Sequence, residues 1–554
     1  MSNNQPQKKV TLENFYYSIN EEDQTASVIK CRIDATEIII PRSIKHELKE
    51  YIVTIISVEA FIFSGAKSVS FEPNSELRTI EKDAFKYSKL ESIRIPSSVT
   101  KICEGAFSHC RQLSRVEFEP SSELRTIEKD AFSNTKVASI RIPASVVDLK
   151  DGWFFGTKKL CQVEVEPGNA QYSSVGGKCI TCKSDISQEE YDTLAFWTSN
   201  SIEANIPSTI KIIGSYAFSE SKLESIIIPS HVTQICDHAF YKCRKLSRVE
   251  FETNSELRTI EIHAFSYSKL ESIIIPSHVT QICDHAFYEC IQLSLVEFEP
   301  NSELQTIGEY AFFKSKVTSI KIPASVVDLK DGWFIGIKCL CHVEVEPGNA
   351  RYSSVDGKCI IYKSNSSQED YDTLIVCAKD SIEANIQSTI KIIGTYSFSF
   401  SKLVGIVIPS HVTQICESAF FYCNQLSRVE FEPNSELQTI GEYAFSYSKL
   451  EIIIIPSHVT QICESAFSSC EQLSRVEFEP NSELQIIENR AFSYSNLTSI
   501  LIPSHITKIC EGAFSSCEQL QIVEIEENSV FESIDMRIFG ECKIVMFPAQ
   551  KKNL

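Results

Sequence analysis

Apolar and polar positions follow one pattern through most of the chain. A stretch such as KLSRVEF (245–251) alternates the two kinds of residue, which predicts a short strand with Leu246, Val249 and Phe251 on one face. Proline or Glu-Pro-Asn then ends the strand, because proline cannot donate to a strand ladder. A second apolar pair leads into an Ala-Phe dipeptide (239–240), whose ring we expect to fill the space between neighbouring units.

This pattern is repeated at fixed intervals. Ile-Pro-Ser or Ile-Pro-Ala recurs in steps of 47 or 86 residues, and each 47-residue step holds two related units of about 23–24 residues. The prolines are Pro96, Pro143, Pro229, Pro276, Pro323, Pro409, Pro456 and Pro503. A longer period of 180 residues is also present, since Trp153 recurs as Trp333 and Cys179 as Cys359. The chain therefore contains an internal duplication of a repeat array.

A single unit of this kind cannot bury its own apolar face, so neighbouring units must stack. The sequence predicts a solenoid that is mostly β. Its short strands are expected to form a continuous, curved parallel sheet, with irregular or short helical turns on the other face. Two related segments that begin at residues 168 and 348 interrupt the array.

The repeat also carries a family resemblance. The pattern L-x-x-I-x-I-P-x-x-V-x-x-I-x-x-x-A-F-x-x-C, as in residues 90–110, resembles the BspA-like leucine-rich repeats of bacterial and protist surface antigens. The resemblance covers roughly residues 55–545. It implies a leucine-rich-repeat solenoid in which the two interrupting segments are β-hairpin inserts. It also implies a non-enzymatic surface antigen or adhesin that binds host or microbial proteins.

We expect seven segments along the chain. They are an N-terminal cap (1–54), a first array block (55–166), a first hairpin insert (167–205), a second block (206–346), a second insert (347–385), a third block (386–527) and a C-terminal cap with its tail (528–554).

Charge and hydropathy narrow the partners and the compartment. The 554 residues carry a net charge of -20, which argues against nucleic acid and anionic membranes as primary partners. There is no apolar run of 18 residues and no apolar stretch near the N-terminus typical of a signal peptide. These features favour the cytoplasm, whereas the resemblance implies the cell surface, with peripheral association. An intracellular protein-interaction scaffold is therefore the alternative function.

The 21 cysteines include six pairs with the spacing Cys-x6-Cys. These pairs are 103/110, 236/243, 283/290, 416/423, 463/470 and 510/517. In the intervening units the second position holds serine or threonine, which predicts packed thiols, with disulfides inside each coil as the alternative. The sequence Cys236-Asp237-His238 is not read as a metal site, because the equivalent residues 416–418 are Cys-Glu-Ser.

No catalytic motif is present. The chain lacks G-x-S-x-G, H-E-x-x-H and G-x-x-x-x-G-K-[ST], so we expect no enzyme activity, no catalytic residue, no cofactor and no metal. An enzyme would require the two inserts to build a pocket, and this is the weakest of the three hypotheses.

The outward strand positions are the candidate protein-binding site. Units with Arg and Glu at these positions alternate with units that carry aliphatic residues, and polar rims around apolar patches are typical of protein interfaces. The region from 406 to 501 is the richest. The alternative is that these aliphatics only favour strand formation, or that curvature covers them. The candidate residues are Ile227, Ile274, Val407, Arg428, Glu430, Ile452, Ile454, Arg475, Glu477 and Leu501.

Overall fold

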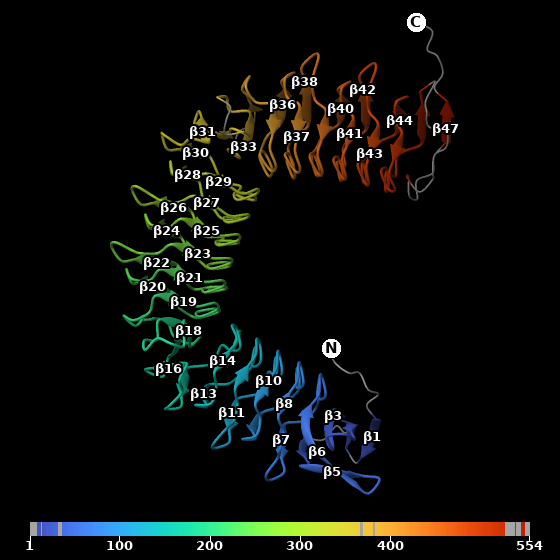
Figure 1. The fold of residues 1–554 in the computed structure, drawn as a ribbon. Helices are drawn as coiled ribbons and strands as arrows, with labels where there is room; N and C mark the ends of the chain where they lie inside the picture. Colours follow the sequence, from blue (N-terminus) through green and yellow to red (C-terminus); the bar gives the residue numbers. More distant parts are fainter. Residues whose placement is uncertain are drawn as a thin grey trace. The chain divides into compact units, whose positions relative to one another are not determined.

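The chain winds into stacked coils. The computed structural model describes residues 8–12, 14–31, 36–365, 369–380, 383–526, 538 and 545–548. The chain divides into two compact units, Met1–Leu270 and Glu271–Leu554. In both units a coil contains a four-residue strand, a two-residue strand and a turn with the Ala-Phe dipeptide (Figure 1).

The four-residue strands follow the predicted alternation. In β20 the side chains of Ile226 and Ile228 are buried, whereas Ile227 between them is exposed. In unit 1 these strands are β4 (Glu37–Ile40), β7 (Ser68–Phe71), β9 (Ser92–Ile95), β11 (Arg115–Phe118), β13 (Ser139–Ile142), β15 (Gln162–Val165), β20 (Ser225–Ile228) and β22 (Arg248–Phe251). In unit 2 they are β24 (Ser272–Ile275), β26 (Leu295–Phe298), β28 (Ser319–Ile322), β30 (His342–Val345), β36 (Gly405–Ile408), β38 (Arg428–Phe431), β40 (Ile452–Ile455), β42 (Arg475–Phe478), β44 (Ser499–Ile502) and β46 (Ile522–Ile525).

These strands pair in parallel, but only in short runs. Strands β4, β7, β9 and β11 form one sheet, whereas β13 pairs only with β15 and β40 only with β42. The predicted solenoid of stacked parallel strands is confirmed, but the ladder of the four-residue strands is divided into several short sheets and is not one continuous sheet. Strands followed by Pro-Ser or Pro-Ala alternate with strands followed by Glu-Pro or Glu-Thr, and the breaks between β11 and β13, between β26 and β28 and between β38 and β40 each follow a strand of the second kind.

The two-residue strands form the longer parallel ladders. Their register joins equivalent residues of successive coils, such as Ile80, Ile102 and Ile127. In unit 1 these strands are β8 (Thr79–Ile80), β10 (Lys101–Ile102), β12 (Thr126–Ile127), β14 (Asp148–Leu149), β19 (Ile212–Ile213), β21 (Gln234–Ile235) and β23 (Thr259–Ile260). In unit 2 they are β25 (Gln281–Ile282), β27 (Thr306–Ile307), β29 (Asp328–Leu329), β35 (Ile392–Ile393), β37 (Gln414–Ile415), β39 (Thr439–Ile440), β41 (Gln461–Ile462), β43 (Ile486–Ile487) and β45 (Lys508–Ile509).

Each Ala-Phe turn joins its neighbour through backbone hydrogen bonds. In the turn around Phe240, residues 238 and 242 have φ values of 57° and 56°, in the left-handed region. The N–H groups of His238, Phe240 and Lys242 donate to carbonyl oxygens of the next coil at 2.7–2.9 Å. Because left-handed residues alternate with other conformations along the turn, every second N–H group points towards the next coil. These turns lie on the side of the two-residue strands that is away from the four-residue strands (Figure 1).

The phenylalanine of the turn fills the space between coils, as predicted. The rings of Phe420 and Phe445 are 4.9 Å apart with an interplanar angle of 4°, and those of Phe445 and Phe467 are 5.3 Å apart. All three side chains are fully buried. Such rings stack from coil to coil and form the centre of the core.

Buried cysteines and serines alternate beside this core. The Cys243 thiol donates to the Phe218 carbonyl oxygen at 3.0 Å and lies 3.3 Å from the Ser221 hydroxyl. The same arrangement recurs at Cys110, Cys423 and Cys470. The cysteines of pairs 103/110, 236/243, 416/423 and 463/470 are thiols, as predicted, and form no bridge within a coil. Burial raises the pKa of Cys243 to about 12, so its thiol stays protonated.

Antiparallel strands occupy the two interrupting segments. In unit 1, β16 (Tyr172–Val175), β17 (Cys179–Cys182) and β18 (Thr193–Trp197) lie within the range 167–205. In unit 2, β31 (Tyr352–Val355), β32 (Cys359–Tyr362) and β33 (Thr373–Cys377) lie within 347–385. Strands β18 and β33 then pair in parallel with β19 and β35, so each insert joins the ladder of two-residue strands.

The two ends of the chain depart from the repeat. At the N-terminus, β1 (Lys8–Leu12), β2 (Phe15–Asn20) and β3 (Thr25–Cys31) are antiparallel, and β5 (Ser43–His46) forms a hairpin with β6 (Lys49–Ile56). The expected C-terminal cap lies largely outside the described residues, apart from β47 (Val545–Pro548), which pairs with β46. Among the described residues no α-helix is found, so the turns are irregular and not helical.

We expect Phe445→Ala to lower the free energy of unfolding by about 3–5 kcal/mol, because it opens a cavity between two stacked rings. Urea unfolding of the full chain, followed by circular dichroism, would measure the change. Tyr447→Ala is the control, since that side chain is 45% exposed and its loss should cost less than about 0.5 kcal/mol. Equal unfolding midpoints for the two variants would contradict the role assigned to the ring stack.

Candidate protein-binding surface

The first and third residues of the four-residue strands face outward, except that Gly405, the first residue of β36, is buried. We call the surface that they form the strand face. Alternation along a strand places successive side chains on opposite sides, so an Ile-x-Ile core pair leaves the residue between its members outside. Ile454 is 49% exposed, whereas Ile453 and Ile455 are buried. The strand face is therefore set by the same alternation that builds the core.

All ten predicted residues lie on the strand face. The six aliphatic residues are between 39% and 55% exposed. Of the charged residues, Arg428, Glu430 and Arg475 are exposed and Glu477 is half-buried. Ile227 belongs to unit 1 and the other nine belong to unit 2.

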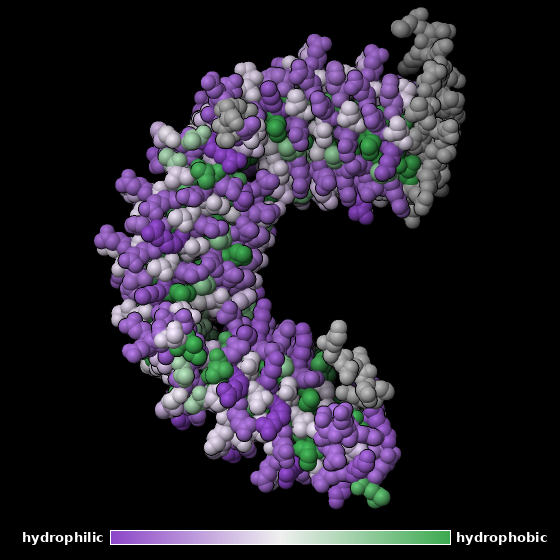
Figure 2. Space-filling view, viewed as in Figure 1, coloured by the Kyte–Doolittle hydropathy of each residue, from purple (hydrophilic) through white to green (hydrophobic). Residues whose placement is uncertain are grey.

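The strand register decides which of these residues are neighbours. Val407 lies beside Glu430, Ile452 beside Arg475, and Ile454 beside Glu477. Leu501 lies beside Glu524, and Ile227 beside Glu250. Each aliphatic side chain therefore has a charged neighbour on the paired strand, at the ordinary strand spacing of about 4.8 Å. On the side of the molecule seen in Figure 2, hydrophobic residues lie as separate spots in a mostly hydrophilic surface.

The charged residues of the strand face pair within one strand. Arg428 and Glu430 are 3.6 Å apart, and Arg475 contacts Glu477 in the same way. Ion pairs with this exposure contribute less than about 1 kcal/mol, because water and salt screen them. The four side chains can therefore exchange these contacts for contacts with a partner at little cost.

Three aliphatic residues of the strand face were missed in the sequence, namely Leu295, Ile522 and, in β4, Ile39, which is 64% exposed. Leu295 is 41% exposed and Ile522 is 40% exposed, and each stands where the matching strands carry arginine. The sequence contained enough information to find Leu295 and Ile522, since both occupy the outward first position of their strand. Ile274 and Leu295 precede the predicted region 406–501 in the chain, and Ile522 follows its last residue, Leu501. Exposed aliphatic residues are therefore also found on both sides of that region.

A groove of about 570 Å³ lies beside Val407 on this surface. It borders Arg428 and the end of the second insert, where β34 (Glu383–Ala384) pairs with β36. Gly405 opens the groove, because a Cβ atom there would lie 3.2 Å from the Arg428 Nε atom. Gly405 was not among the residues predicted from the sequence.

The first insert leaves a hollow among the Ala-Phe turns of unit 1. Strand β18 places Trp197 where other coils have phenylalanine, with ring centroids 5.5 Å from Phe218. The backbone N–H of Trp197 donates to the Ala217 carbonyl oxygen, and the backbone N–H of the next residue, Thr198, donates to the Lys178 carbonyl oxygen instead of continuing a turn. One turn is therefore missing from the stack, and the space forms a cleft of about 510 Å³.

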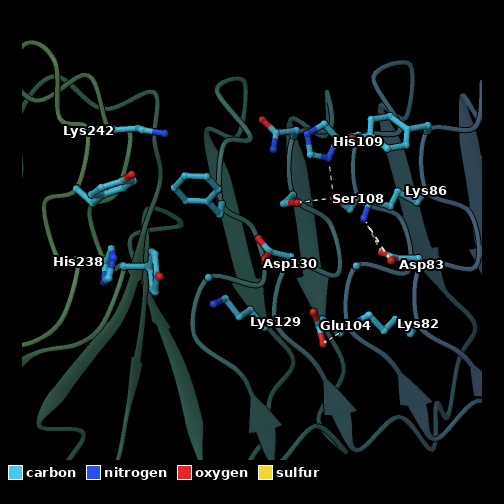
Figure 3. A pocket seen from close by; sticks show the side chains of 18 residues that line it. Lys82, Asp83, Lys86, Glu104, Ser108, His109, Lys129, Asp130, His238 and Lys242 are labelled. Carbon is cyan, nitrogen blue, oxygen red and sulfur yellow. Dashed lines mark hydrogen bonds and ion pairs between the residues drawn. The ribbon is translucent and has the colours of Figure 1, made fainter. Parts of the chain in front are cut away.

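We call this hollow the first cleft (Figure 3). Its basic residues include Lys82, Lys86, Lys129 and Lys242, and the first two form ion pairs with Glu104 and Asp83 at 3.2 Å. Lys129 lies 5.9 Å above the Tyr216 ring. Burial lowers the pKa of His109 and His238, so these rings are neutral at pH 7 and the positive charge of the first cleft comes from lysine.

The second insert produces an equivalent hollow within unit 2. Cys377, at the end of β33, donates its N–H to the Ser397 carbonyl oxygen, and Ala378 bonds back to Lys358. A turn is again missing, and the space has a volume of about 470 Å³. We call it the second cleft. Sequence reasoning missed both clefts, because their linings come from coils on either side of an insert.

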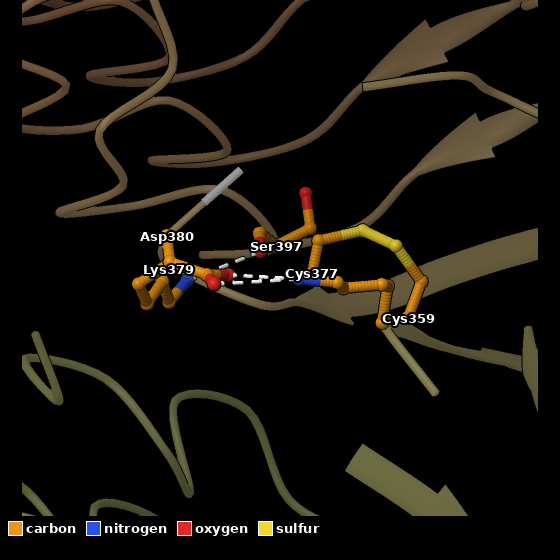
Figure 4. Close-up of a disulfide and its surroundings, with 6 residues drawn as sticks. Cys359, Cys377, Lys379, Asp380 and Ser397 are labelled. Atoms are coloured by element: carbon orange, nitrogen blue, oxygen red, sulfur yellow. Dashed lines mark hydrogen bonds and ion pairs between the residues drawn. A yellow bond between two sulfur atoms is a disulfide. The ribbon is translucent and has the colours of Figure 1, made fainter. Parts of the chain in front are cut away.

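A disulfide joins two strands of the second insert. Cys359 and Cys377 are opposite each other in the register of β32 and β33, and their sulfur atoms are bonded (Figure 4). The equivalent pair in the first insert is Cys179 and Trp197, which cannot form a bridge. This disulfide was not predicted, because only the hairpin register brings the two cysteines together.

Lys379 is buried next to this disulfide. Its side chain is 1% exposed, and Nζ donates to the Ser397 carbonyl oxygen at 3.2 Å (Figure 4). Burial lowers the pKa of Lys379 from its ordinary value of 10.5 to about 8. The equivalent position in the first insert holds Ser199, so the lysine is not required by the fold of the insert.

Neither a membrane span nor a metal centre is seen in the described part of the chain. Over these residues no helix is long and apolar enough to cross a bilayer, and no three His, Cys, Asp or Glu side chains are grouped as metal ligands. That the protein is not an enzyme and needs no cofactor stays a prediction from the sequence.

Known proteins were compared with the chain. The family model described as BspA type leucine-rich repeat region (6 copies) matches five segments of the chain, residues 36–161, 189–268, 258–356, 377–462 and 438–553. No curated protein matches.

Several solved structures are similar to the chain. The crystal structure of the pneumococcal vaccine antigen PcpA is 23% identical over 62% of this chain and 94% of that chain, with a TM-score of 0.51. A leucine-rich cell surface protein from Faecalibacterium prausnitzii is 22% identical over 95% of this chain and 96% of that chain, with a TM-score of 0.33. At this identity the likeness to PcpA shows a shared fold.

We expect the stability of the protein to rise between about pH 8 and pH 10.5 through Lys379. In this window the unfolded chain binds a proton that the folded chain does not, so each rise in pH favours the folded state, by about 3 kcal/mol over the window. Lys379→Met should remove this contribution and be more stable than the wild type at pH 7. Urea unfolding at pH 7 and pH 10 would test it, with the exposed Lys358→Met as control. A pH dependence unchanged in Lys379→Met would contradict the assignment.

Proposed function

Because the chain belongs to the BspA-type leucine-rich repeat family, we propose that it is a protein-binding surface antigen or adhesin. It engages host or microbial proteins through the strand face and carries no catalytic centre. The observation that supports this most is the set of half-exposed aliphatic side chains, each next to a charged residue on the paired strand. Protein interfaces combine apolar anchors with arginine and a polar rim in this way.

The strand face of unit 2 is the better part of the proposed interface. Its outward aliphatics include Val407, Ile452, Ile454 and Leu501, whereas the outward positions of β9 and β13 carry Arg94 and Arg141. Removing aliphatic side chains from water is favourable by about 25 cal/mol per Å² of apolar surface, and the part of this that exceeds the cost of association stabilises a complex. The groove beside Val407 adds a recess in which a partner side chain can bind.

An intracellular interaction scaffold is the second candidate. Its supporting observation is that Cys161, Cys339 and Cys341 are exposed thiols, which persist more readily in a reducing compartment. The Cys359–Cys377 disulfide favours the oxidising compartment of the first proposal. Both candidates use the strand face and differ in where the protein is found.

The three exposed thiols provide a test of location. We expect a membrane-impermeant maleimide to label Cys161, Cys339 and Cys341 in intact cells that make the protein, with Cys110 and Cys243 as buried controls that stay unlabelled until denaturation. Mass spectrometry of tryptic peptides would identify the labelled residues. Labelling only after lysis would contradict the surface proposal and support the intracellular scaffold.

A triple variant tests the binding surface. We expect Val407→Ser, Ile454→Ser and Leu501→Ser together to weaken binding to protease-sensitive sites on host or bacterial cells by at least about tenfold, since each buried anchor contributes about 1 kcal/mol. Flow cytometry with labelled full-length protein would measure the affinity.

The control variant replaces Ile186, Ile202 and Ile291 by serine, because these residues are 52–67% exposed and lie outside the four-residue strands. Neither variant should change the urea midpoint. Equal losses of binding in the two variants, or none in either, would contradict a role for the strand face.

A further inference from the structure

The second cleft is lined by aromatic side chains that come from coils on both sides of the insert. They include Tyr310, Phe313, Tyr396, Phe400, Phe421 and Tyr443. The hydroxyl groups of Tyr310 and Tyr396 share a hydrogen bond at 3.0 Å, although 86 residues separate them. The Phe400 and Phe421 ring centroids are 5.9 Å apart and nearly perpendicular. The rings are half-buried, so parts of them remain open to a ligand.

The fold does not require all of this aromatic lining. The first cleft occupies the equivalent place 180 residues earlier, with Asp130 in place of Tyr310 and Ser133 in place of Phe313. Asp130 and Tyr310 both have left-handed backbone conformations, with φ values of 57° and 52°. This conformation is sterically costly for a bulky residue. Because Asp130 and Ser133 build the same turn, the rings of Tyr310 and Phe313 need an explanation other than folding, whereas Tyr396 and Phe421 have aromatic counterparts in Tyr216 and Tyr241 of the first cleft.

Acidic residues surround the second cleft. The exposed Glu417 carboxylate belongs to its lining. Burial and the nearby carboxylates of Glu442, Asp331 and Glu309 raise the pKa of Glu417, against a hydrogen bond from Tyr396. The residue equivalent to Glu309 in unit 1 is Lys129, which lines the first cleft. The two clefts of this chain therefore differ in charge as well as in aromatic content.

The cations near the second cleft already have acidic partners. Lys314 lies 4.9 Å above the Phe313 ring and is held by Glu289 at 2.8 Å. Lys330 lies 2.7 Å from Asp328. The position of Lys314 also shows that a ring of this cleft can accept a cation on its face. The charge of Glu417 is thus available to a ligand from outside.

We propose that the second cleft binds an arginine side chain of a partner polypeptide, with the guanidinium held between the aromatic rings and the Glu417 carboxylate. A guanidinium stacks on aromatic faces and pairs with carboxylates through parallel N–H bonds. The cleft volume of about 470 Å³ is within the range of pockets that bind small ligands. This site lies among the Ala-Phe turns and is separate from the strand face, so either proposal can fail without the other.

A matched pair of short peptides tests the arginine site. We expect Ac-Gly-Arg-Gly-NH2 to bind the full-length protein saturably, with a Kd of about 1 mM, in saturation-transfer NMR. The citrulline peptide, which has the same shape without the charge, should bind about tenfold more weakly, because it cannot pair with a carboxylate. Glu417→Gln should weaken binding of the arginine peptide by a similar factor and leave binding of the citrulline peptide unchanged.

Two further variants complete the test. Phe400→Leu should weaken binding of both peptides, and Glu220 at the equivalent position shows that the turn folds without an aromatic residue there. Asp237→Asn is the control, since Asp237 is the counterpart of Glu417 in unit 1, and it should bind like the wild type. The proposal is overturned if the arginine peptide does not saturate, if citrulline binds equally well, or if Asp237→Asn loses as much affinity as Glu417→Gln.

Discussion

The stacking of one phenylalanine ring on the next is the contact on which the rest of this structure depends. Phe420, Phe445 and Phe467 are fully buried with centroids about 5 Å apart, and no single coil could bury its ring alone. The left-handed residues of each turn point N–H groups towards the next coil, so the hydrogen bonds and the ring stack have the same repeat distance. The serine–cysteine contacts follow the same spacing. The left-handed backbone conformation costs energy in each turn. The ring stacking and the hydrogen bonds that recur from coil to coil offset this cost.

Each insert interrupts that stack and so creates the main irregularities of the molecule. Strands β18 and β33 continue the ladder of two-residue strands but bring no Ala-Phe turn, and a cleft opens where the turn is missing. The backbone plan of the two clefts is the same, whereas their side chains have diverged after the duplication. Both clefts contain aromatic rings at the positions of Tyr216 and Tyr396, but lysines such as Lys129 line the first, whereas Tyr310, Phe313 and Glu417 line the second. The shared rings can belong to the common fold, and the differing residues are not required by it.

The strand face shows how the core alternation also determines a surface. Buried isoleucines at the second and fourth strand positions leave the first and third outside, and these can vary without a large cost in stability. In unit 2 the outward positions hold aliphatic residues beside glutamate or arginine. The arginines pair with glutamates of their own strand, so the charged residues stay solvated until a partner replaces those contacts.

The sequence by itself determined the solenoid, the burial of the Ala-Phe rings, the packed thiols and the outward position of all ten candidate residues. These features repeat with the coil, so a local pattern is sufficient to assign them. Only the tertiary structure decided the breaks between four-residue strands, the groove opened by Gly405, the Cys359–Cys377 bridge and the two clefts. Each of these features depends on contacts between coils that an insert or a difference between coils separates in the sequence. Tyr310 and Tyr396, for example, share a hydrogen bond although 86 residues separate them. A repeat pattern records the position of a residue within its coil, but it carries no information on which distant coil it contacts.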